Sequence, residues 1–233
     1  MTESRTGGAP SATERAYAYV KARLLDGSYP DGELLSEGEV AADLEMSRTP
    51  VREAFLRLQS EGFLRLYPKR GALVVPISPG EAQAVLEARL VMEGFAIDKL
   101  AARGSEALRD VGATLSAQPA AIPTEMDLLS EADRHTADRD FHARLVAAAE
   151  NPLISDQYDA LRDRQVRITA TARRQDPAYI PTIVREHAEI AEALRAGEPV
   201  RAKQLLRAHL RSSLRRLGLT PGPLLAEEID SVG

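Results

Sequence analysis

The stretch that decides the fold of the N-terminal region is residues 36–58, which read SEGEVAADLEMSRTPVREAFLRL. Ser36 stands three residues before Glu39, which is the spacing of a capping box at a helix start. Ser47 begins a further helix that has Pro50 in its first turn, where a missing N–H costs no intrahelical hydrogen bond. The stretch therefore predicts two short helices in succession.

The flanking sequence extends this pair of helices into a winged helix-turn-helix. A helical periodicity over about residues 14–25 precedes the pair. After it, the β-prone runs 63–67 and 72–75 are separated by Pro68-Lys69-Arg70-Gly71, which predicts a hairpin with a basic tip. We expect three helices and a β-hairpin wing over residues 14–76.

Charge is unevenly distributed in this region, although the net charge of the chain is −5. Residues 26–45 hold seven acidic residues and neither Lys nor Arg, whereas residues 46–75 hold six basic residues against two acidic ones. A local basic face on an acidic protein is typical of a focused contact with nucleic acid. The alternative is a solvated cluster of charges.

The third helix separates its charged and apolar side chains. Arg48 and Arg52 are four residues apart, so they project from one face, opposite an apolar stripe made by Val51, Phe55 and Leu58. A helix that enters the major groove with its first turn presents such arginines to guanine. This geometry predicts a recognition helix.

The motif Leu35-Ser36-Glu37, followed by Ser47-Arg48-Thr49-Pro50-Val51-Arg52-Glu53-Ala54, resembles the DNA-binding signature of the GntR family of bacterial transcription regulators. The resemblance covers about residues 14–76. Many family members have a basic residue between the two glutamates of the second helix, where this chain has Gly38. With the positive helix end and the basic hairpin tip included, the expected DNA-binding residues are Ser47, Arg48, Thr49, Arg52, Arg70 and Gly71.

Composition excludes several classes of protein. At 44% hydrophobic and 28% charged residues, the chain has the composition of a globular protein, and no stretch approaches the roughly 18 apolar residues of a membrane span. The first residues lack the basic and apolar segments of a signal peptide, so we expect a cytoplasmic protein. Without cysteine there is no disulfide, thiolate ligand or cysteine nucleophile.

A second, all-α domain is expected after a linker over residues 77–80. It covers residues 81–218 as a bundle of six to seven helices, since helical periodicity recurs without a convincing alternating strand. Residues 1–13 are expected to form a disordered leader, and residues 219–233 a flexible tail. The expected helices lie near residues 80–103, 105–117, 124–136, 138–149, 153–172, 178–196 and 199–217.

Three of the four histidines are expected on inward faces of this bundle. His142 shares a helix face with Asp138, four residues before it, while His187 and His209 lie among apolar residues at helical spacing. Each histidine alone is more often a core residue than a ligand. Burying three without partners would cost about 1–3 kcal/mol each, and a shared metal would satisfy all three.

The pattern Asp138-Arg139-Asp140-Phe141-His142, Asn151-Pro152, Glu186-His187 and Ala208-His209-Leu210 resembles the FCD effector domain of the FadR branch, over about residues 80–217. The resemblance implies that Asp138, His142, His187 and His209 hold one divalent metal ion per chain. Such ligands suit zinc, our first choice, and also nickel, manganese or iron. His135 is a reserve ligand or a neighbour of the site.

A small carboxylate metabolite could occupy open positions on such an ion. Arg89, where related domains often have arginine, either pairs with that carboxylate or forms an ion pair with Glu93. We therefore expect a homodimeric transcription regulator, a repressor by family analogy, that binds a short palindromic operator in double-stranded DNA and responds to the metabolite. Alternatively, the metal is structural or is itself the signal. A metal-dependent hydrolase is disfavoured, because no additional base accompanies the ligands, so we expect no enzyme activity.

Overall fold

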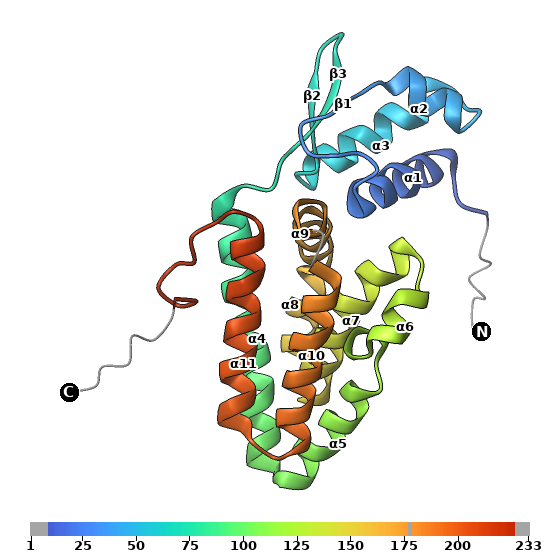
Figure 1. Cartoon of the computed structure of the whole chain (residues 1–233). Helices are drawn as coiled ribbons and strands as arrows, with labels where there is room; N and C mark the ends of the chain where they lie inside the picture. The colour runs from blue at the N-terminus through green and yellow to red at the C-terminus, as the bar shows by residue number, and fades with distance from the viewer. Residues whose placement is uncertain (1–8, 177–178, 227–233) are drawn as a thin grey trace, which may run out of the picture. The chain divides into compact units, whose positions relative to one another are not determined.

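The computed structural model describes residues 9–176 and 179–226 (Figure 1). The side chains of Asp127, Glu131, Ala132, His135 and Gln175 are outside this description, so the expected role of His135 is not addressed by it. The chain divides into two compact units, Met1–Pro76 and Ile77–Gly233. Among the described residues, no helix combines the length and apolar character needed to cross a membrane.

The first unit is a winged helix-turn-helix, as predicted. Its strands are antiparallel in the order β1-β3-β2, with Leu64 opposite Val74 and Tyr67 opposite Gly71. The elements are α1 (Ala12–Asp26), β1 (Leu34–Leu35), α2 (Glu37–Asp43), α3 (Arg48–Ser60), β2 (Leu64–Tyr67) and β3 (Gly71–Val74).

Side-chain caps mark two of the three helix starts in this unit, and all three starts differ from expectation in some respect. Ser11 forms a capping box with Glu14, so α1 begins two residues before residue 14 and shortens the expected leader, of which residues 1–8 are not described. Ser36 accepts from the Gly38 N–H at 3.2 Å, one residue earlier than a capping box with Glu39 requires. Ser47 has the backbone of a cap but makes no side-chain hydrogen bond to the first turn of α3.

The short strand β1 was not predicted, and it explains why residue 71 is glycine. Leu35 pairs with Ala72, which brings the Leu35 carbonyl oxygen to within 2.2 Å of where a Cβ on Gly71 would lie. Gly71 also has φ +103°, a conformation that other residues rarely adopt. Glycine is therefore required for the sheet to close on its third strand.

The second unit consists of helices and their connections, with no strand among its described residues, which confirms the expected class. Within that part of the chain it has eight α-helices, more than the six or seven expected, and a 3-10 turn. The elements are α4 (Pro79–Arg103), α5 (Ser105–Ser116), η1 (Pro119–Ala121), α6 (Pro123–Leu128), α7 (Glu131–Ala148), α8 (Pro152–Ala160), α9 (Arg162–Gln175), α10 (Tyr179–Arg195) and α11 (Pro199–Arg216).

Two expected helix boundaries in this unit are wrong, and the expected linker and tail are partly structured, since Pro79 and Gly80 already belong to α4. The break expected near residue 137 lies at Leu129 and Ser130, where the Ser130 hydroxyl accepts from the Asp133 N–H at 3.2 Å and starts α7. The expected helix over 153–172 breaks at Leu161 into α8 and α9. The tail expected to be flexible from residue 219 is partly packed, because Leu225 is fully buried; residues 227–233 are not described.

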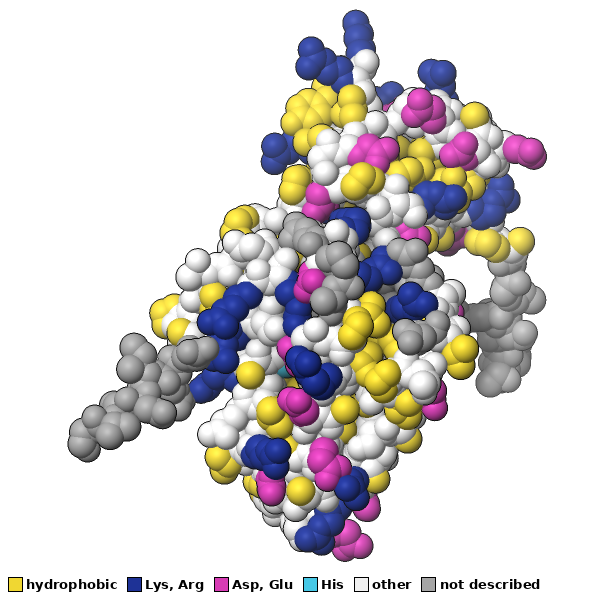
Figure 2. Space-filling view, viewed as in Figure 1, with side chains coloured by type: hydrophobic (Ala, Val, Ile, Leu, Met, Phe, Trp, Pro, Cys, Tyr) yellow, Lys and Arg dark blue, Asp and Glu magenta, His cyan; other side chains and the backbone are white. Residues whose placement is uncertain are grey.

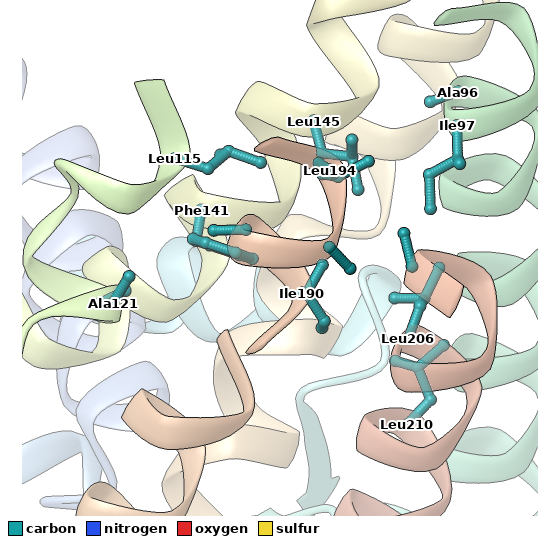
Figure 3. Packing of buried hydrophobic residues seen from close by; sticks show 14 of the residues in the cluster. Ala96, Ile97, Leu115, Ala121, Phe141, Leu145, Ile190, Leu194, Leu206 and Leu210 are labelled. Carbon is teal, nitrogen blue, oxygen red and sulfur yellow. The ribbon is translucent and has the colours of Figure 1, made fainter. Parts of the chain in front are cut away.

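The core of the second unit lies between α4, α5, α7, α10 and α11, whose apolar side chains point toward one another (Figure 3). Ile97, Leu145, Leu194 and Leu206 are among its buried members. Gly112 permits the close contact of α5 with α10, since a Cβ there would lie 2.3 Å from the Arg195 nitrogen. This core fixes the facing surfaces of α7, α10 and α11.

Candidate metal centre and DNA-binding surface

Four potential metal ligands converge inside the second unit. Asp138 and His142 come from one face of α7, His187 from α10 and His209 from α11. Each offers one ligand atom, and these atoms all lie within 4.8 Å of one another. All four residues are buried. The unbroken α7 is what presents the first two ligands together.

Each of the three imidazoles has its Nδ1 at hydrogen-bond distance from an oxygen acceptor. An Nδ1–H that donates to oxygen fixes the tautomer and leaves the lone pair on Nε2, which is how metal-binding histidines are held. The pairs are His142 with Glu93 Oε2 at 2.7 Å, His187 with the Ala120 carbonyl at 3.0 Å, and His209 with Glu186 Oε2 at 2.9 Å.

The Nε2 atoms of this arrangement face each other. His142 Nε2 lies 3.1 Å from His187 Nε2, which is itself 3.6 Å from Asp138 Oδ1. Burial, reinforced by the Arg89 charge, lowers the pKa of His142 to about 4, and burial lowers the pKa of His187 well below its ordinary value. Both rings are then neutral at pH 7, and two lone pairs cannot hydrogen-bond to each other. The donor set therefore fits a cation.

Asp138 completes the set with one oxygen. Its Oδ2 accepts a hydrogen bond of 3.1 Å from the Thr169 hydroxyl on α9. This bond orients the carboxylate and leaves Oδ1 toward His187. Three imidazoles and one carboxylate are ligands for zinc and neighbouring divalent metals.

Glu93 is a central residue of the site, although the sequence predicted it only as a possible ion-pair partner of Arg89. Its carboxylate is fully buried and accepts from Arg89 Nε at 2.8 Å and from the Tyr158 hydroxyl at 2.8 Å, in addition to His142. Burial alone would raise the pKa of Glu93, but Arg89 and then His142 hold it well below its usual range. Glu93 is thus a buried anion that orients a candidate ligand, His142.

Arg89 forms the expected ion pair with Glu93 and retains further donor capacity. Its side chain is buried, and within the described part of the chain its Nη2 has no hydrogen-bond partner. The ion pair therefore exists without using the whole guanidinium. Nothing in the sequence pattern indicated that one nitrogen would be left over.

Glu186 holds the third histidine from the opposite side. Its carboxylate accepts from His209 Nδ1 and, at 3.1 Å, from Arg216 Nη2. Burial opposes ionisation of Glu186, yet the bonds to His209 and Arg216 lower its pKa to about 2. The Glu186-His187 pair thus serves two different imidazoles: His187 offers its own nitrogen, and Glu186 orients that of His209.

In the first unit, α2, α3 and the wing line a groove of about 610 Å³. Basic side chains project at the tip of the β2–β3 hairpin (Figure 2). The groove brings together four of the expected DNA-binding residues, while Ser47 and Thr49 are exposed at the start of α3 and do not line it. The four are Arg48, Arg52, Arg70 and Gly71.

Gly38 lies directly beneath one of these arginines. A Cβ at residue 38 would be 3.1 Å from Arg48 Nη2 and 3.4 Å from its Cζ. The guanidinium of Arg48 thus occupies space that a side chain at residue 38 would need. The sequence marked Gly38 as unusual but gave no indication of this contact.

Comparison with known proteins gives matches along both units. The family model "Bacterial regulatory proteins, gntR family" matches residues 12–74, and the model "FCD domain" matches residues 84–212. An uncharacterised HTH-type transcriptional regulator of Agrobacterium vitis is 33% identical over 134 residues, which are 58% of this chain and 78% of that protein.

Two further relatives cover more of the chain. A probable D-xylose utilization operon transcriptional repressor of Paenarthrobacter nicotinovorans is 28% identical over 199 residues, 84% of each chain. The solved structure of E. coli McbR/YncC has a TM-score of 0.66 at 20% identity and covers 90% of this chain and 98% of that one. At that identity, the structure supports the fold alone.

Replacing Glu93 with Gln should lower metal affinity by about 10-fold to 100-fold, because an amide holds the His142 Nδ1–H less strongly than a carboxylate does. Asp98→Asn, an exposed change on the same helix, is the matched control. Competition with a chelator measures both variants against the parent protein. Equal affinities for all three would show that Glu93 does not orient a ligand.

Replacing Arg48 or Arg52 with Ala should weaken specific DNA binding by about 1–3 kcal/mol for each bidentate hydrogen-bonded pair with a base that the change removes. Arg15→Ala, which removes the same charge from an exposed position on α1, should have a much smaller effect. Titration of the operator at one fixed salt concentration measures the difference. If neither α3 variant differs from the Arg15 variant, α3 does not read the bases.

Proposed function

The chain belongs to the GntR family of bacterial regulatory proteins and carries an FCD domain, and on this premise we propose that it is a metabolite-controlled transcriptional repressor of the FadR branch. It is a DNA-binding transcription regulator and not an enzyme. The observation that carries the proposal is the set of three imidazoles, each with Nδ1 held by an acceptor, whose Nε2 atoms meet Asp138 in one cluster.

The DNA-binding half of the proposal rests on α3 and the wing. Arg48 and Arg52 read base edges in the major groove, and Ser47 and Thr49 contact phosphate at the positive end of α3. Arg70 contacts the backbone from the wing. Gly71 lets the wing backbone come close to the DNA, although the pairing of β1 with β3 already requires glycine at this position. Repression is inferred from the relative named as a repressor.

The effector half places one divalent metal on Asp138, His142, His187 and His209, with zinc as the first candidate and nickel or manganese as the others. The ion supplies a buried positive charge that accepts oxygen ligands, so a small carboxylate metabolite binds there. Arg89 Nη2, which is buried and unpaired among the described groups, offers that carboxylate a second cationic partner.

Control of DNA binding then follows from linkage. A metabolite can shift the equilibrium of a homodimer only if it binds one state more tightly than the other. If it weakens operator binding, DNA must weaken metabolite binding by the same factor, typically about 5-fold to 150-fold. The proposal therefore requires both affinities to change together.

The full-length protein should retain about one equivalent of metal after reconstitution with zinc, nickel or manganese and dialysis at neutral pH, where His142 and His187 are neutral. His187→Ala and His209→Ala should lose that metal and the heat of binding acetate, lactate or succinate. Operator binding without metabolite should survive, because α3 and the wing belong to the other unit. Elemental analysis and titration calorimetry measure both properties, with the exposed Glu189→Ala as control.

Two results would contradict parts of this proposal. Less than about a tenth of an equivalent of metal in the parent protein would make the histidines ordinary core residues. The parent protein could instead bind a full equivalent of metal, while carboxylates give no heat of binding and do not change operator affinity. The metal would then be structural, or would itself be the signal.

The operator should be a short palindrome bound by a homodimer, since two-fold symmetric regulators read two half-sites. Sedimentation at micromolar concentration should give a dimer. Scrambling one half-site should weaken binding by about tenfold or more, because mismatched base pairs cost about 1–3 kcal/mol each. A monomer that binds the scrambled and intact operators equally well would contradict the dimer.

A further inference from the structure

Helix α9 is unusual because it is polar in sequence and yet buried over its central residues. Residues 162–175 read RDRQVRITATARRQ, and residues 165–170 are all buried. The helix packs against α7, α4 and α11. Buried polar side chains in native proteins are almost always hydrogen-bonded, so each polar group along this stretch requires a partner. Thr169 has one, the Asp138 carboxylate.

Gln165 is the exception on α9. Its side chain is 2% exposed, and neither its Nε2 nor its Oε1 has a hydrogen-bond partner among the groups that the structure describes. An amide left unsatisfied in this way is costly, because each buried polar group has lost the hydrogen bonds that it would make to water. The amide therefore presents an unpaired donor atom, Nε2, and an unpaired acceptor atom, Oε1, inside the effector unit.

The position of Gln165 relates it to the metal cluster. It lies one helical turn before Thr169, so both side chains are on the face of α9 that meets Asp138. On α4, Arg89 likewise lies one turn before Glu93, which bonds His142, and Arg89 Nη2 is also unpaired among the described residues. Two unpaired buried groups thus each lie one turn from a residue bonded to a candidate metal ligand.

We propose that Gln165 binds a hydroxyl group of the effector, so that the effector is a hydroxylated carboxylate. The inference rests on the proposed function, in which the metal and Arg89 bind the carboxylate. A hydroxyl is the smallest group that both donates to Oε1 and accepts from Nε2. A methylene could do neither, and a second carboxylate would only accept, leaving Oε1 unpaired. The amide is also neutral, so it would not balance the negative charge of a second carboxylate on the effector.

The expected selectivity is large because it comes from an unpaired polar group. A site built to hydrogen-bond a hydroxyl strongly rejects the analogue that lacks it, since the polar groups of the site then stay buried and unsatisfied. Carboxylates that differ only by hydroxyl groups should therefore differ in affinity, and the difference should depend on Gln165.

The test is titration calorimetry of zinc-loaded, full-length protein with two matched pairs, lactate against propionate and gluconate against hexanoate. At least one hydroxylated member should bind about tenfold or more tightly than its partner. Gln165→Met, which keeps the side-chain length and removes both polar atoms, should abolish that preference. Gln204→Leu, on the exposed face of α11, should leave it unchanged.

The outcomes separate this inference from the function on which it rests. If no carboxylate binds the loaded protein, the proposed function fails and the role of Gln165 fails with it. If carboxylates bind but neither pair differs, or if the preference persists in Gln165→Met, only the role of Gln165 is overturned. The parent protein alone shows whether a hydroxyl preference exists, so the inference stays testable if the variant does not fold.

Discussion

An imidazole can be buried at low cost only if both of its nitrogens have partners. The second unit buries three imidazoles in contact with one another, those of His142, His187 and His209. Phe141 stacks on His187 with ring centroids 4.3 Å apart, which fixes one face of the cluster. Oxygen acceptors take each Nδ1, and the remaining Nε2 atoms converge with Asp138. A shared cation would satisfy these nitrogens together, so the candidate site adds a constraint to the arrangement of α7, α10 and α11.

The acceptors impose a further constraint, because two of them are anions, of which Glu93 is fully buried and Glu186 is partly buried. Glu93 is balanced by Arg89, and Glu186 by Arg216. Breaking a buried pair is costly because it leaves an uncompensated charge, whereas an intact pair contributes little net stability. Buried Arg89 and partly buried Arg216 therefore balance the two carboxylates that hold His142 and His209. This explains why polar and charged residues accumulate in a helical bundle that could otherwise be wholly apolar.

The sequence predicted the helix faces, which local spacing determines, but not the hydrogen-bond acceptors, which come from distant parts of the chain. The four-residue separation of Asp138 and His142 placed them on one face, and apolar neighbours placed His187 and His209 inward. The acceptor for His142 lies 49 residues away and that for His187 lies 67 residues away, so periodicity could not find them. Strand β1 was missed because its two residues are too few to show a periodic pattern. Buried Leu225 was missed for the same reason, since a single apolar residue carries no periodicity. Ser130 could have marked the true start of α7 from its capping position.

Through its charge, Arg89 connects the candidate metal site to the proposed effector site. One guanidinium nitrogen bonds Glu93, whose other oxygen bonds His142. A carboxylate that binds the remaining nitrogen of Arg89 competes with Glu93 for the same positive charge. Glu93 would then hold the His142 Nδ1–H with less of its charge neutralised, which strengthens that bond and the basicity of Nε2. Metal and effector affinities should rise together, and reciprocity requires each to raise the other by the same factor.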